Sequence, residues 1–63
     1  MQYNINAVLL DGTFVFSATA GWLPNKGDEI EAGGYVFVVK SVRYKIQQGT
    51  TYTTNVELRL AHA

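Results

Sequence analysis

The sequence predicts an all-β fold: a small five-stranded, partly open barrel of the SH3-like or OB-like kind, with a bulge in its long fourth strand. Three observations predict it. Apolar and polar residues alternate over several short segments, which is the two-residue period of a strand. Turn-forming pairs such as Asp-Gly and Gly-Gly separate those segments. Apolar residues at helical spacing never continue for long enough to predict a helix.

The 63 residues are expected to form a single domain, residues 1–63. A chain this short buries only about 60% of the surface that it exposes when unfolded, and such domains often rely on disulfides, a metal or a partner. The sequence has no cysteine, and its one histidine, His62, lies next to the C-terminus, so we expect no disulfide, metal or cofactor. Stability must then come from the 48% of residues that are hydrophobic, or from self-association.

The charge is balanced, with five basic and five acidic residues. Proteins that neutralise several phosphates normally carry a basic excess, so nucleic acid is not the leading partner. Neutrality also weakens the repulsion between copies and favours association. No segment has the length of a membrane-spanning helix, and the N-terminus lacks the basic region of a signal peptide, so we expect a cytoplasmic protein with no membrane contact.

Residues 2–10 and 13–18 are expected to form the first hairpin, joined by Asp11-Gly12. Asp-Gly between two apolar runs favours a two-residue type I′ turn with positive φ at both positions. The resulting register places six residues on the core side: Ile5, Ala7, Leu9, Phe14, Phe16 and Ala18.

Residues 19–28 contain two glycines and the single proline and are expected to form a loop. Its Trp22 and Leu23 are large and apolar, so we expect them to plug one end of the barrel. An exposed Trp22 that serves in recognition is the alternative. A short strand over 29–31 and a tight turn over 32–34 follow.

The longest strand is expected over 35–46, where the apolar alternation changes phase near Lys40 and Ser41. A one-residue bulge there would bring both sets of apolar residues to one face and bend the strand. A hairpin loop over 47–51 then leads to the last strand, 52–60. Five residues of that strand alternate onto one face: Tyr52, Thr54, Val56, Leu58 and Leu60.

The stretch from Pro24 to Ile30, followed by Gly34 to Val39, is similar to a P-x-x-G-D-x-I … G-x-x-(Y/F)-x-V rhythm. Many unrelated small barrels show it, among them uncharacterised phage and mobile-element proteins. The resemblance supports the fold and suggests a phage or mobile-element origin, but it implies no activity.

The sequence carries no catalytic constellation. Asp28, Glu29 and Glu31 form an acidic cluster, but the spacing of a calcium loop is absent, so we expect a solvated turn and a charged strand edge. His62 has no acidic neighbour, and we expect a frayed terminus there. No motif positions a histidine beside a serine or threonine, and we therefore expect a protein that is not an enzyme.

Four basic residues could gather on the last two strands: Lys40, Arg43, Lys45 and Arg59. Together with nearby tyrosines they would form a face that binds single-stranded nucleic acid by stacking and phosphate contacts. Two observations weaken this alternative. Tyr44 is expected on the inner face, and Glu57 lies among the basic residues.

Three apolar residues point away from the predicted core of the first hairpin: Val8, Leu10 and Val15. An apolar strip that the core does not use is typical of a subunit or partner interface. The leading hypothesis is therefore a non-enzymatic protein-interaction module that forms homo-oligomers. A single-stranded nucleic-acid binder and a small-ligand binder with its site between subunits are the alternatives.

Overall fold

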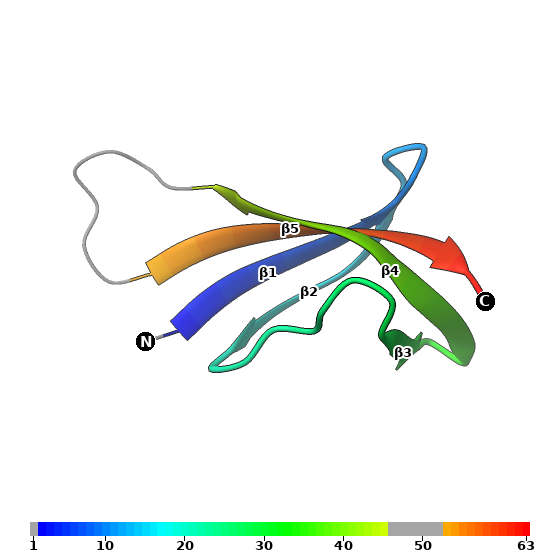
Figure 1. Ribbon diagram of the computed structural model, residues 1–63, viewed down its shortest axis with the longest axis horizontal. Helices are drawn as coiled ribbons and strands as arrows, with labels where there is room; N and C mark the ends of the chain where they lie inside the picture. The colour runs from blue at the N-terminus through cyan, green and yellow to red at the C-terminus, as the bar shows by residue number, and fades with distance from the viewer. Residues whose placement is uncertain (1, 46–52) are drawn as a thin grey trace.

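The computed structural model describes residues 2–45 and 53–63, which form one five-stranded sheet. The strands are β1 (Gln2–Leu9), β2 (Phe14–Ala20), β3 (Glu29–Ala32), β4 (Tyr35–Lys45) and β5 (Thr53–His62). Their order across the sheet is β2-β1-β5-β4-β3, so β2 and β3 are its two edges. The sheet is long and curled, and β3 and the loop after β2 lie in the lower part of the view in Figure 1. The predicted all-β, partly open five-stranded barrel is confirmed.

The first and last strands of the chain lie side by side at the centre of the sheet. β1 pairs in parallel with β5 over its whole length, with Ile5 opposite Val56 and Ala7 opposite Leu58. The other three pairings are antiparallel. Figure 1 shows β1 and β5 running side by side through the middle of the molecule.

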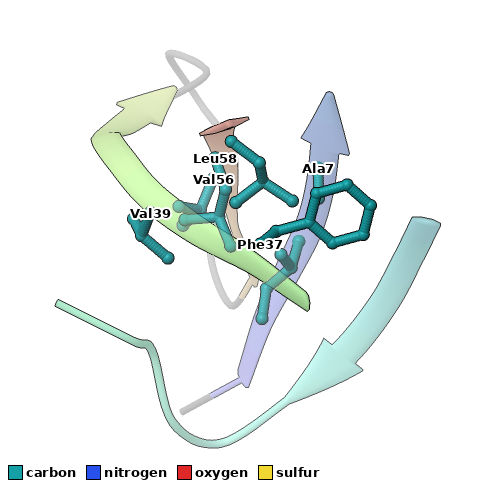
Figure 2. Close-up of a cluster of buried hydrophobic side chains, with 7 residues drawn as sticks. Ala7, Phe37, Val39, Val56 and Leu58 are labelled. Carbon is teal, nitrogen blue, oxygen red and sulfur yellow. The ribbon is translucent and has the colours of Figure 1, made fainter. Parts of the chain in front are cut away.

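The core lies on the concave face of the sheet. Because side chains alternate between the faces of a strand, the odd residues of β1 and the even residues of β5 point to this face together. Seven residues form the buried cluster: Ile5, Ala7, Phe37, Val39, Val56, Leu58 and Leu60. Figure 2 shows Phe37 of β4 reaching over towards Ala7, with Val56 and Leu58 beside it. The predicted inward face of the last strand is confirmed for Val56, Leu58 and Leu60, and Tyr52 lies outside the described residues.

The bulge predicted in the long strand is confirmed. Val39 pairs with Leu60 and Ser41 pairs with Arg59, which leaves Lys40 as the extra residue. The bulge moves Val42 onto the core side, where it packs against the buried cluster. The phase change in the sequence is therefore the signature of the bend in β4.

The turn of the first hairpin differs from the prediction. Leu9 accepts a hydrogen bond from the N–H of Gly12 at 2.9 Å and donates its own N–H to the carbonyl of Thr13 at 2.8 Å. The loop thus consists of Leu10, Asp11 and Gly12, and Gly12, its last residue, has a φ of 93°. Asp11 does not have positive φ, so the type I′ turn predicted at Asp11-Gly12 is wrong. Gly33 and Gly34 instead have φ of 61° and 85°, as a type I′ turn between β3 and β4 requires.

A second bulge follows from the three-residue loop. Ala7 pairs with Phe16 as predicted, but Val8 pairs with Phe14, so Val15 has no partner of its own in β1. Phe14, predicted to lie in the core, is 62% exposed, whereas Val15 packs against the buried cluster. Val8 is only 8% exposed. The predicted outward strip is therefore wrong for Val15, which packs against the core, whereas Val8 lies outside the buried cluster but is covered, so of the three residues only Leu10 is exposed.

We predict that Gly12→Ala destabilises the protein by about 1–2 kcal/mol, because an L residue is strained at positive φ. A Cβ at Gly12 would meet no atom within 4 Å, so the whole effect comes from the backbone. Gly12→Asn is the matched control and should cost less, because asparagine tolerates this conformation. Urea unfolding measures both, and an unchanged midpoint for Gly12→Ala would contradict the three-residue loop.

Candidate functional site: the open side of the half-barrel

An apolar groove of about 240 Å³ lies on the concave face between the two edge strands. Ile5 and Leu58 contribute to it from the central strands. Its other apolar lining comes from the edges and the loop between them: Phe16, Ala18, Ala20, Trp22, Pro24, Ile30 and Ala32. Glu31 is the one charged residue in the lining. The groove exists because the sheet curls without bringing β2 against β3.

Trp22 stands at this groove and is 65% exposed. The prediction that it plugs the barrel is wrong, because its neighbours take that place. Leu23 packs against the buried cluster and Pro24 is buried. Trp22 is thus exposed, as the alternative of a recognition residue requires, and it lies next to Leu23 and Pro24, which anchor the loop.

The loop that carries Trp22 is fixed to β4 by backbone hydrogen bonds. Gly27 donates to the carbonyl of Val39 at 2.8 Å, and Val39 donates to the carbonyl of Asp28 at 2.9 Å. The Asp28 carboxylate accepts the backbone N–H of Asn25 at 2.7 Å. Asp28 is therefore a turn-forming residue. Among the described residues, no group of three or more acidic or histidine side chains lies together as a metal site would need.

The two edges of the sheet differ in chemistry. β3 has four residues, and Glu29 and Glu31 on it are exposed, which protects an edge against further pairing. β2 has seven residues, Phe-Val-Phe-Ser-Ala-Thr-Ala, with neither charge nor proline. Within residues 2–45 and 53–63, no strand pairs with the outer edge of β2. An uncharged, β-prone edge of this length is a template for another strand.

His62 belongs to the last strand, so the expected frayed terminus is wrong. It pairs with Phe37, and the centroids of their rings are 5.0 Å apart. The exposed ring of Tyr35 meets His62 edge to face, with centroids 6.2 Å apart. His62 therefore has a packing role at the C-terminal end of β5.

The basic residues of the last two strands surround Glu57. Lys45 Nζ lies 3.3 Å from Glu57 Oε2, and Arg59 Nε lies 3.3 Å from Glu57 Oε1. Arg59 also donates to the carbonyl of Leu10 at 3.1 Å, and Arg43 sits opposite Glu57 in the β4–β5 register. Lys40 is at the bulge, apart from this group. The structure thus brings together Arg43, Lys45 and Arg59 of the four predicted residues, around a carboxylate that pairs with two of them and offsets one of the three positive charges.

The pKa of Glu57 lies below its ordinary value. The hydrogen bond from Lys45 is the main cause, and the charge of Lys45 and the contact with Arg59 add to it. The pKa of Asp11 is also lowered, by hydrogen bonds from the side chain and the backbone N–H of Thr13. Both carboxylates thus favour the folded state when they are ionised.

A row of polar side chains crosses the opposite, convex face. Thr19 Oγ1 donates to Asn4 Oδ1 at 3.1 Å, and Asn4 Nδ2 donates to Asn55 Oδ1 at 3.1 Å. This row joins β2, β1 and β5 through exposed hydrogen bonds. This polar row contrasts with the apolar groove on the concave side, although Leu10 and Phe14 are also exposed outside the groove.

Comparisons with protein-family models, with curated proteins and with solved structures found no significant match for the chain. In the described residues, no helix is long and apolar enough to cross a membrane. The groove, the exposed Trp22 and the uncharged edge of β2 are therefore the features on which a function can be based.

We predict that Glu57→Gln lowers the thermal unfolding midpoint at neutral pH and that this difference shrinks in acid. A carboxylate with a lowered pKa stabilises the fold above its unfolded value, 4.5 for Glu57, and loses this effect as the pH falls through the folded pKa. Because the ion pairs border solvent, the effect should be small and should weaken in high salt. Melting curves of wild type and variant from neutral to acidic pH test this. A difference that stays constant in acid would contradict it.

Proposed function

We propose that this chain is a cytoplasmic, non-enzymatic protein-interaction module that forms homo-oligomers through the open side of its half-barrel. One observation carries the proposal: an uncharged edge strand, β2, borders an apolar groove with an exposed tryptophan. Contiguous apolar surface on a small domain is typical of a binding site. The predicted self-association is kept, but the surface moves from the Val8, Leu10 and Val15 strip to β2 and Trp22.

Energetics support a protein as the occupant. Tryptophan is enriched among the residues that dominate binding energies, because it buries a large apolar area and keeps a polar N–H for a partner. The groove volume of about 240 Å³ falls below the roughly 300–1,000 Å³ of common small-molecule pockets. Covering this surface would also supplement the thin stability of a small domain.

We predict that the wild-type protein self-associates as its concentration rises and that Trp22→Ala weakens association by about 2 kcal/mol, or roughly thirtyfold in Kd. Sedimentation velocity over a wide concentration range measures both. Tyr44→Ala is the matched control, because Tyr44 is 56% exposed but does not line the groove. A wild-type protein that stays monomeric at high concentration would refute the homo-oligomeric proposal, and equal effects of the two variants would exclude the groove.

We further predict little or no oligonucleotide binding at physiological salt. Glu57 offsets one of the three positive charges of Arg43, Lys45 and Arg59, and the whole chain is formally neutral, so it lacks the basic excess that phosphate binding normally needs. Fluorescence anisotropy with a labelled single strand at low and physiological salt measures this. Binding that falls steeply with salt and is lost in Arg43→Ala plus Lys45→Ala would replace the proposal with the nucleic-acid alternative.

A further inference from the structure

We propose that two copies of this chain pair antiparallel along β2, with the twofold axis at Ala18, so that their sheets join into one. This inference rests on the proposed homo-oligomeric function and specifies the contact that produces it. An isologous contact of this kind uses the same strand of both copies and closes after two subunits.

The edge itself favours a second copy over other partners. No charged residue occurs from Gly12 to Asn25, a stretch that includes all of β2. A partner strand of like sequence therefore meets no repulsion, and the whole chain is formally neutral. The other edge, β3, carries exposed glutamates, and pairing it with its own copy would bring carboxylates together. Self-pairing is thus opposed at one edge and unopposed at the other.

The regular part of β2 sets the register. Residues 16–20 pair with β1 without a shift, whereas Val15 belongs to the bulge. A twofold axis at Ser17 would run the new pairing into that bulge, and an axis at Thr19 would leave Phe16 unpaired. An axis at Ala18 uses all five regular residues.

Side chains match across this register. Phe16 lies opposite the partner's Ala20, so a large residue meets a small one on the concave face. Ser17 lies opposite the partner's Thr19 on the convex face, and Ser–Thr pairs can hydrogen-bond across antiparallel strands. Ala20 and Trp22 both line the groove, so each Phe16 ring would extend the apolar lining of the other copy's groove.

The test uses the absence of cysteine from the chain. Residues directly opposite each other in an antiparallel pair have Cα atoms roughly 4.5–5.5 Å apart, within the range of a disulfide. Ala18 is exposed, so Ala18→Cys should fold normally. We expect this variant to form a disulfide-linked dimer on mild oxidation, seen by non-reducing electrophoresis, while its far-ultraviolet circular dichroism stays unchanged.

Two controls define the register. Ser17→Cys alone should not cross-link efficiently, but a mixture of Ser17→Cys and Thr19→Cys chains should form the mixed disulfide. Glu31→Cys, on the opposite edge, should form no disulfide-linked dimer under the same conditions. Cross-linking that is equal for Ala18→Cys and Glu31→Cys would overturn the inference.

A charge test uses no disulfide. Ala18→Lys would place two ammonium groups across the axis, so we expect the dimer Kd to rise roughly tenfold or more. Ala63→Lys adds the same charge at an exposed site away from β2 and should leave the Kd unchanged. If the wild type is monomeric, the proposed function fails together with this inference. If the wild type dimerises but Ala18→Cys does not cross-link and Ala18→Lys has no effect, only the β2 contact is overturned.

Discussion

The parallel pairing of β1 with β5 is the contact on which the rest of the structure depends. It joins the first and last strands of the chain and places Ile5 and Ala7 beside Val56 and Leu58 at the centre of the core. β2 is attached to the sheet only through β1, and β4 only through β5. Parallel pairing of distant segments carries a large loop-closure cost before it gains burial. The core of this small domain therefore forms only when both ends of the chain are in place.

Two one-residue bulges then decide which side chains the core receives. The bulge at Lys40 lets a strand whose apolar residues change phase keep them on one side. The bulge at Val15 does the reverse for the first hairpin, because it sends Phe14 outward while Val15 packs against the core. Bulges also increase local twist and bend a strand, in keeping with a sheet that is curled (Figure 1).

The same curl leaves the barrel open, and the apolar groove with Trp22 lies at this opening. The convex face carries a row of hydrogen-bonded polar residues and an ion-pair group around Glu57. The concave face carries the groove and Trp22, bordered by a strand without charge. Natural sheets usually protect such an edge with charge, proline or a cover. The proposed contact between two β2 strands supplies that cover from a second copy.

The number and type of the strands, the bulge in β4 and the burial of Val56, Leu58 and Leu60 could all be predicted from the sequence, because two-residue alternation and turn residues are local signals. The β1–β5 pairing could be seen in the folded structure alone, since no local signal specifies which distant strands meet. The same holds for the three-residue loop at Gly12. That loop moved the register by one residue only between the loop and the bulge at Val15, and it reversed the roles of Phe14 and Val15. The groove could not be predicted either, because Trp22 is exposed by the way Leu23 and Pro24 anchor its loop.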